Sequence, residues 1–380
     1  RGERRQFFVK QKEAGEFPPR FCCPAGAVVG RVFAAPVKSP QKFARNVAPE
    51  MLLFTEVYDK IIFESSKQEK VPQMNARNTL KINQNGHLEI GGADTVALAE
   101  QFGTPLYVMD EQYIRDMCAA YKRAIDEEYG GNGLVLYASK AFSCKAVYRI
   151  VQEEGIGVDV VSGGELYTAL QAGFPAEKIY VHGNNKLRSE LEFSVESGVG
   201  AIVVDAYSEL DALDEICAEK GVVQDILIRV NPGVEAHTHH FIQTAKTDSK
   251  FGFSIADGSA EKIAKYALGK KNLALQGFHS HIGSQIFEMQ SFKLAAEKLL
   301  TFAAQLRENT GFEAAKLNLG GGFGIWYTDD DAKQSVADYA ENLKSLLREV
   351  SVLADRKGLR RPYLLVEPGR AIVGEAGITI

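Results

Sequence analysis

The sequence lacks several features that mark common classes of protein. Its five cysteines are scattered, without CxxC spacing or a metal-ligand pattern, so we expect no disulfide framework and a reducing compartment. The longest apolar runs have the length of a β-strand, too short to span a bilayer. A net charge of -5 leaves no basic excess for nucleic acid or an anionic membrane. We therefore expect a cytoplasmic protein that binds neither.

Residues 1–77 differ in composition from the rest of the chain. Residues 1–45 carry ten basic and three acidic side chains, a balance of +7, and six prolines interrupt residues 18–49. We expect an extension with little fixed structure; an organelle transit peptide is the alternative. Because regular patterning begins just after Met74, our hypothesis is that Met74 is the natural start and that residues 1–73 lie outside the functional fold.

The remaining 303 residues, counted from residue 78 of 380, show alternating strand and helix patterns. Leu80–Ile90, with Asn85-Gly86 at its centre, predicts a hairpin, and Pro105–Met109 predicts a further strand. After a helix over about 111–129, eight apolar runs alternate with segments of helical period. The runs are Val135–Ser139, Gly157–Val161, Ile179–His182, Ala201–Asp205, Ile226–Val230, Leu275–Ser280, Lys316–Leu319 and Tyr363–Val366. This order predicts an α/β fold with a (β/α)8 TIM-type barrel, or a doubly wound sheet as the alternative.

Polar residues and glycines gather where these strands end. They are Lys140, Asp159, His182, Asp205, Arg229, His279, His281, Ser284, Gly320, Gly321, Gly322, Glu367, Gly369 and Arg370. Barrel enzymes build their active sites at the carboxyl ends of their strands, so this distribution favours the barrel and places a site at its mouth.

Lys140 follows the apolar run that begins at Val135. Burial lowers the pKa of a lysine and frees its lone pair, as Schiff-base chemistry with the aldehyde of pyridoxal 5'-phosphate (PLP) requires. A lysine that points into solvent is the plain alternative.

Two later strand ends suit a phosphate group. Gly320-Gly321-Gly322 allows backbone N–H groups to approach an anion. Gly369 is a second glycine at which the backbone can come close to the anion, and Arg370 adds a cation. Barrels often bind phosphate in the loops after their last two strands. Together, the two motifs predict a phosphate site.

Glu367 either forms a structural ion pair or keeps a pyridine nitrogen protonated. His279 and His281 lie at i and i+2, on one face of a strand. Zinc is an alternative there, but we favour an imidazole stacked on a flat ring, with Ser284 donating to the phosphate. The cluster His237–His240 is either a surface loop or a flap over the substrate.

In this order, the motifs resemble the fold-type III PLP-dependent decarboxylases, and especially their diaminopimelate decarboxylase branch. The resemblance covers nearly all of Leu80–Ile380. The motifs are Tyr137–Ala141, Asp159–Leu166, Arg229–Gly233, Thr247–Phe253, His279–Gln285, Gly320–Gly324 and Glu367–Arg370.

The resemblance implies a role for each site residue. Lys140 would be the Schiff-base lysine, His281 the residue stacked on the PLP ring and Glu367 the partner of the pyridine nitrogen. Ser284, Gly321, Gly322 and Gly369 would contact the phosphate, Arg370 the phosphate or a substrate carboxylate, and Asp159 and Arg229 the ring side. The implied reaction is decarboxylation of meso-2,6-diaminopimelate to L-lysine.

The resemblance also implies a domain division. Residues 78–110 would belong to a β-domain and residues 111–380 to the PLP-binding barrel. In the family, a C-terminal β-domain with a Cys-Glu-Ser motif and a tyrosine completes the active site of a partner in a homodimer. The sequence stops at Ile380, so we expect a truncated copy with poor turnover, whose strands before Asp110 lack sheet partners.

Three other functions remain open. A sister decarboxylase would act on arginine, ornithine or carboxynorspermidine. A non-catalytic PLP-binding barrel would not need the strands of 80–109, and alanine racemase, which shares the fold type, would need other neighbours in the site.

Overall fold

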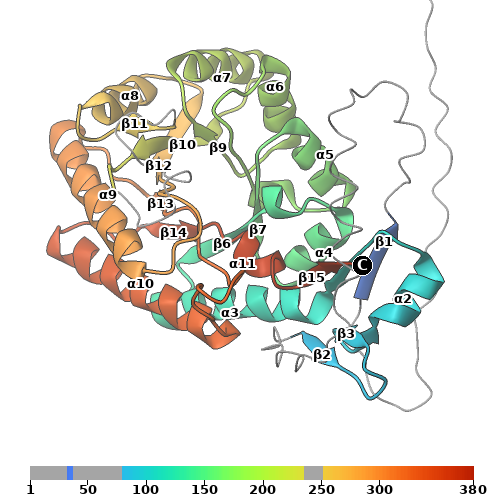
Figure 1. Ribbon diagram of the computed structural model, residues 1–380. Coiled ribbons are helices and arrows are strands. Elements are labelled where there is room, and N and C mark those ends of the chain that lie inside the picture. Colours follow the sequence, from blue (N-terminus) through green and yellow to red (C-terminus); the bar gives the residue numbers. More distant parts are fainter. Residues whose placement is uncertain (1–31, 37–78, 235–250) are drawn as a thin grey trace, which may run out of the picture.

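The computed structural model describes residues 32–36, 79–234 and 251–380, and its main feature is a closed barrel of parallel strands (Figure 1). In order around the barrel, the strands are β6 (Gly133–Ala138), β7 (Gly157–Val160), β8 (Ile179–Val181), β9 (Ala201–Val204), β10 (Gln224–Asn231), β12 (Leu273–His279), β13 (Lys316–Asn318) and β14 (Tyr363–Val366). Pairing of β14 with β6 closes the ring, and the short β11 (Phe253–Ser254) adds to β10. The predicted barrel and its eight strands are confirmed, which excludes the doubly wound sheet.

Helices surround the strands (Figure 1). They are α3 (Glu111–Tyr129), α4 (Lys145–Glu153), α5 (Gly163–Gln171), α6 (Arg188–Ser197), α7 (Tyr207–Lys220), α8 (Ser259–Leu268), α9 (Met289–Thr310), α10 (Val336–Arg356) and α11 (Arg370–Val373), with single 3-10 turns η3 (Ser139–Ala141) and η4 (Ala176–Lys178). In α10, for example, Leu343, Leu346, Leu347 and Val350 recur at helical spacing and are all buried. Among the helices of the described ranges, none is long and apolar enough to cross a membrane.

The strands divide their side chains between two apolar layers. Residues such as Val135, Val158 and Ile202 pack outward in the large core shared with the helices. Side chains at the alternate positions point into the barrel. There, a separate buried cluster fills the half nearer the amino ends of the strands. That cluster consists of Leu136, Tyr180, Ala201, Val203, Leu227 and Leu365.

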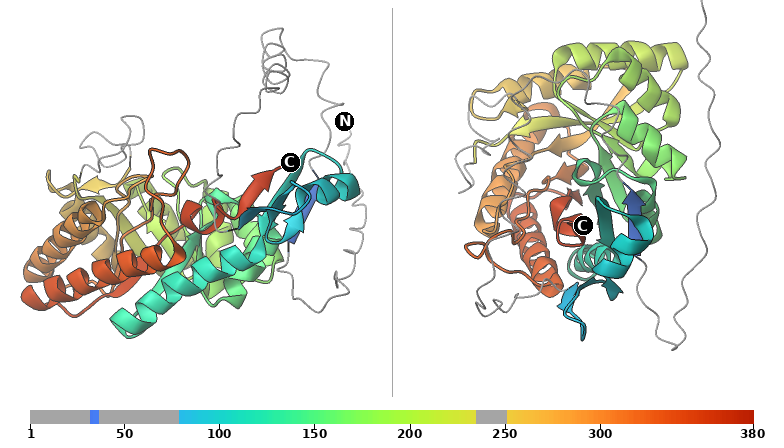
Figure 2. Two further views of the ribbon diagram at one scale, coloured as in Figure 1. Left: turned by 60° about the horizontal axis from the view of Figure 1, so that its bottom comes forward. Right: turned by 45° about the vertical axis from the view of Figure 1, so that its right-hand side comes forward.

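A smaller β-structure lies beside the barrel (Figure 2). Its elements are β1 (Val32–Pro36), β2 (Leu80–Ile82), β3 (Leu88–Ile90), β4 (Ala93–Asp94), α2 (Thr95–Phe102), β5 (Leu106–Asp110) and β15 (Gly377–Thr379). The predicted hairpin is confirmed, since Leu80 pairs with Ile90 across β2 and β3.

Two expectations for this part are wrong. Residues 32–36, within the segment expected to have little fixed structure, form β1 and pair with β5. The run Val-Phe-Ala-Ala before Pro36 explains this, because four apolar residues suffice for an edge strand that ends at a proline. The strand β5 also has a partner on its other side, β15, so it is not an open edge.

Gly277 provides a test of the barrel register. A Cβ atom built on this residue of β12 would lie 1.8 Å from the carbonyl oxygen of Lys316 in β13. We expect Gly277→Ala to force the strands apart and to lower the free energy of unfolding by roughly 2–4 kcal/mol. Gly269→Ala, where the added atom would meet only Tyr266 O at 3.4 Å, is the matched control. Equal urea midpoints for the two variants would contradict the described register.

Candidate active site

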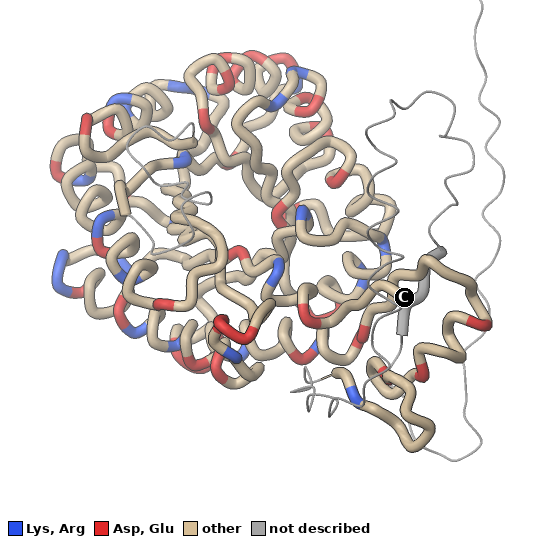
Figure 3. The backbone as a smooth tube through the Cα atoms, viewed as in Figure 1, with Lys and Arg blue, Asp and Glu red and all other residues tan. Residues whose placement is uncertain are grey.

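The barrel interior changes from apolar to polar toward the carboxyl ends of the strands. Four polar residues each follow an interior apolar residue by two positions. They are His182 after Tyr180, Asp205 after Val203, Arg229 after Leu227 and Glu367 after Leu365. Asp159, His279 and Asn318 lie close to this group, since His182 Nε2 is 3.8 Å from Asp159 Oδ1 and Glu367 contacts both His279 and Asn318. Because side chains alternate along a strand, all of these polar groups point into the barrel. Figure 3 shows charged residues of both signs inside the ring as well as on its outer surface.

Glu367 has polar contacts from several strands. It is only 4% exposed. Asn318 Nδ2 donates to its Oε1 over 2.7 Å, and His279 Nε2 lies 3.4 Å from its Oε2. His182 Nε2 lies 3.1 Å from Oε1, within reach of the charge but without the alignment of a hydrogen bond. Three strands therefore direct polar groups at one carboxylate.

These contacts decide the ionisation of Glu367. Burial would raise the pKa of Glu367, but the charges of His182 and His279 and the hydrogen bond with His279 lower it well below its usual value. Burial lowers the pKa of His279 to about 4, with Glu367 opposing the shift. At neutral pH the site thus holds an ionised carboxylate beside a neutral imidazole.

Asp159 has the opposite environment. Within the described part of the chain, neither of its buried carboxylate oxygens has a hydrogen-bond partner, and His182 Nε2 lies 3.8 Å from Oδ1. Burial raises the pKa of Asp159 to about 6, against the opposing charge of His182 and with the added repulsion of Glu367. In the same barrel interior, the pKa of Asp159 is therefore raised and the pKa of Glu367 is lowered.

Arg229 faces the same interior. Burial lowers the pKa of its guanidinium, while the nearby carboxylates of Asp205, Glu367 and Asp159 oppose this shift. Its guanidinium carbon lies 4.5 Å from the centroid of the Phe251 ring. Arg229 is therefore held between acidic groups and an aromatic face.

The glycines expected to contact phosphate lie against backbone. A Cβ atom at Gly321 would lie 1.9 Å from the carbonyl oxygen of Glu367, and one at Gly369 would lie 2.9 Å from that of Ala138. Arg370 Nη2 donates to Ser284 Oγ over 2.7 Å. Only residues without side chains fit these two turns, so an anion beside Ser284 and Arg370 can come close to the backbone there.

His281 adjoins this cradle. The Gly321 N–H donates to His281 Nδ1 over 3.3 Å. Burial lowers the pKa of His281 well below its usual value, and the charges of Lys140 and Arg229 add to this shift. The ring is therefore neutral at neutral pH.

Of the two interpretations of Lys140, the structure agrees with an exposed side chain. The strand β6 ends at Ala138, and Lys140 lies in the 3-10 turn η3, where its side chain is exposed. The turn carries the amine out of the strand to the mouth of the barrel. Ser139, directly before it, is fully buried and donates to the carbonyl oxygen of Asp159 over 2.8 Å, so the base of the turn is fixed.

Within the described residues, one group of three side chains is close enough to hold a metal ion. The ligand atoms of His182, His279 and Glu367 all lie within 4.8 Å of one another. However, Glu367 already uses these imidazoles and Asn318 as polar partners, and His281 is not part of the group. We therefore interpret the trio as a network around Glu367. The zinc alternative at His279 and His281 has no support in this geometry.

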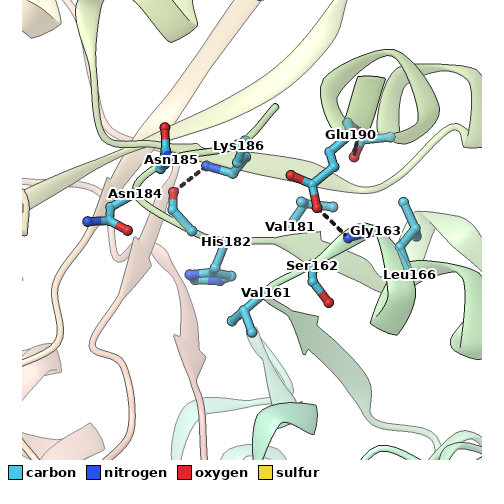
Figure 4. Close-up of a pocket in the computed structure, with 12 residues that line it drawn as sticks. Val161, Ser162, Gly163, Leu166, Val181, His182, Asn184, Asn185, Lys186 and Glu190 are labelled. Atoms are coloured by element: carbon cyan, nitrogen blue, oxygen red, sulfur yellow. Dashed lines mark hydrogen bonds between the residues drawn. The ribbon is translucent and has the colours of Figure 1, made fainter. Parts of the chain in front are cut away.

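A pocket of about 120 Å³ lies beside the site, between the ends of β7 and β8 (Figure 4). Gly163 N donates to Glu190 Oε1 over 2.8 Å, and Lys186 Nζ donates to Gly183 O over 2.7 Å. Lys186 also forms a buried ion pair with Glu209. Because its charged groups are paired within the protein, we assign the pocket no chemistry of its own.

All ten of the predicted site residues lie in the described part of the chain, whereas His237–His240 lies outside it. We assigned no role from the sequence to His182, which follows a predicted strand, or to Asn318. For His182 the available signal was its place two residues after Tyr180, an interior apolar position, whereas Asn318 follows Lys316 and had no such signal. The roles of the ten residues stay predictions at this point.

The pKa of Asp159 leads to a prediction on stability. Because this pKa is raised from 3.8 to about 6, the folded protein binds the proton more tightly than the unfolded chain does. The resulting stabilisation is complete below the unfolded pKa and is lost as the pH rises through about 6. We expect cofactor-free Asp159→Asn to be more stable than wild type by about 1–3 kcal/mol at about pH 8, and equal to it near pH 4.

Urea unfolding across this pH range measures the difference. Asp330→Asn, on an exposed loop, is the control and should give no comparable change. A stability gain for Asp159→Asn that is the same at both ends of the range would contradict the assignment.

Proteins of known family are similar to most of this chain. A family model described as the pyridoxal-binding domain of pyridoxal-dependent decarboxylases matches residues 112–374. The diaminopimelate decarboxylase of Bacillus methanolicus is 49% identical over 302 residues, which are 80% of this chain and 69% of that protein. The enzyme of that name from Bacillus subtilis strain 168 is 48% identical, with 80% and 68% covered.

Solved structures agree. Diaminopimelate decarboxylase from M. jannaschii in complex with L-lysine has a TM-score of 0.71 and 36% identity, and the likeness covers 80% of this chain and 69% of that one. The Helicobacter pylori enzyme with L-lysine has a TM-score of 0.66 and 27% identity, with 75% and 68% covered. The chain therefore belongs to the pyridoxal-dependent decarboxylase family, in its diaminopimelate decarboxylase branch.

Proposed function

We propose that this chain catalyses the PLP-dependent decarboxylation of meso-2,6-diaminopimelate to L-lysine and CO2, the last step of lysine biosynthesis. The observation that carries the proposal is one barrel mouth that combines an ionised buried Glu367, a backbone phosphate cradle at Gly321 and Gly369, and the amine of Lys140. The Bacillus relatives bear the name of this activity, and the M. jannaschii structure contains L-lysine, the expected product.

The residues present fit PLP. Lys140 would hold its aldehyde carbon, and His281 would cover one face of its ring. Glu367 would meet the pyridine nitrogen, with Asp159 and Arg229 on the ring side. The phosphate would lie among Ser284, Gly321, Gly322, Gly369 and Arg370. When bound, PLP supplies an electron sink that stabilises the carbanion left at Cα after CO2 departs.

The protein's part is to fix protons and to position groups. An ionised Glu367 holds a proton at the pyridine nitrogen, because a carboxylate with three polar contacts stays anionic in the barrel interior. His281, neutral through burial, offers a flat face without competing for that proton. Arg370 is bonded to Ser284, so we assign it first to the phosphate and second to a substrate carboxylate.

We further propose residues 111–380 as the cofactor-binding barrel and residues 78–110 as strands of a second β-domain. A separate apolar cluster of Leu80, Ile90, Leu106 and Val108 supports a second domain, against which Ile378 and Ile380 at the end of the chain also pack. A homodimer in the cytoplasm is also proposed. Lys140 is exposed at the mouth, where a partner can cover it, and the free, buried thiols of Cys118 and Cys217 suit a reducing compartment.

Trapping the cofactor on the chain tests this function. We expect the purified protein to develop an absorbance band with PLP, and borohydride to fix the cofactor covalently to Lys140, as located by mass mapping. Lys140→Arg should abolish the adduct and lower CO2 release from meso-2,6-diaminopimelate by roughly a hundredfold or more. Lys145→Arg, an exposed lysine at the start of α4, is the matched control and should retain both.

The same assay separates the substrates. CO2 release from meso-2,6-diaminopimelate should exceed release from arginine or ornithine. A PLP adduct on Lys140 with preference for arginine or ornithine would keep the cofactor site and overturn the substrate. The absence of any adduct on the folded wild-type protein would overturn the function as a whole.

A further inference from the structure

Two segments at the mouth of the barrel are hydrogen-bonded to each other. Segment 283–287 follows β12, and segment 320–325 follows β13. Ile286 N donates to Gly322 O over 2.9 Å, and Gly324 N donates to Ile286 O over 2.9 Å. The relative position of the two segments therefore sets the width of the proposed phosphate cradle.

Gln285 lies where these two segments meet and has an unusual backbone conformation. Among the residues that the structure describes, it is the only non-glycine residue with a positive φ, at 61°. Side chains other than glycine rarely adopt this left-handed region, and such strain persists only where surrounding contacts hold it in place. Strained residues of this kind cluster at ligand sites.

The side chain of Gln285 supplies those contacts. Its Nε2 donates to the carbonyl oxygen of Ile325 over 2.5 Å. Its Oε1 accepts from the N–H of Ile325 over 3.2 Å and from Arg370 Nη1 over 3.2 Å. A single amide thus connects the loop after β12, the glycine-rich segment and the first residue of α11.

This connection orients two groups toward one anion. Arg370 Nη2 donates to Ser284 Oγ over 2.7 Å, so the hydroxyl hydrogen of Ser284 remains available to a phosphate oxygen. The Nη1 contact with Gln285 fixes the plane of the same guanidinium. Charge-assisted hydrogen bonds to phosphate depend on such a fixed orientation.

We propose that Gln285 is a positioning residue that gives the site its selectivity for phosphorylated pyridoxal over pyridoxal without phosphate. The proposal deepens, and rests on, the proposed PLP site. Gln285 acts through Ser284, Arg370 and the backbone of Gly321 and Gly322, and it does not contact the ligand itself.

The geometry explains why a glutamine is needed. Asparagine tolerates the left-handed backbone but is shorter by one methylene group, so its amide cannot reach both Ile325 and Arg370. Glycine suits the backbone best but carries no amide. Both variants lose the side-chain bridge without adding backbone strain, so they test the bridge alone.

The test compares two ligands on the folded protein. Dissociation constants for PLP and for pyridoxal would be measured by absorbance titration for wild type, Gln285→Asn and Gln285→Gly. We expect both variants to bind PLP at least about tenfold more weakly, as for the loss of one charge-assisted hydrogen bond. Pyridoxal affinity should stay within about twofold, because the ring side of the site is unchanged.

Controls separate this proposal from others. Gln112→Asn, on the exposed first turn of α3, should bind both ligands as wild type does. Equal loss of PLP and pyridoxal affinity, or unchanged preference for PLP in both variants, would overturn the role of Gln285. Wild-type protein that binds PLP no more tightly than pyridoxal would instead overturn the proposed phosphate site.

Discussion

The burial of an ionised carboxylate inside the barrel is the constraint on which this site depends. Glu367 is almost fully removed from water, and a charge in that position is costly unless polar partners surround it. Its partners come from β8, β12 and β13, which are far apart in the sequence. They meet only because the barrel closes with His279 opposite Asn318 and Asn318 opposite Leu365. The chemistry of Glu367 is therefore a consequence of strand register.

Glu367 and Asp159 lie in the same barrel interior, but their surroundings shift their pKa values in opposite directions. Glu367 receives a hydrogen bond from Asn318 and has two imidazoles in contact, whereas Asp159 has no hydrogen-bond partner among the residues that the structure describes. The first stays anionic at neutral pH and the second takes up a proton far more readily. Environments that separate the pKa values of neighbouring carboxyl groups are typical of catalytic sites.

Much of this arrangement could be predicted from the sequence because it follows local patterns. Eight apolar runs, each ending in polar residues or glycines, suffice to predict the barrel and its mouth. The sequence left both burial and exposure of Lys140 open, because its position depends on a single turn after Ala138. The pairing of β5 with β1 and β15 depends on segments about 70 and 270 residues away, which no local pattern reveals.

The network around Glu367 was missed for a related reason. His182 and Asn318 are common residue types at strand ends, and nothing local distinguishes them from surface residues. Only their contacts with Glu367 across the barrel interior identify them. Gln285 likewise stands within a noticed motif, but its role arises from a backbone angle and three contacts that the sequence does not display.

The most direct measurement is the nitrogen-15 chemical shift of the pyridine nitrogen in labelled PLP bound to the chain. We predict the shift of a protonated pyridine nitrogen at neutral pH in the wild type, and its loss in Glu367→Gln. An unprotonated nitrogen in the wild-type protein would contradict the central role assigned to the buried carboxylate of Glu367.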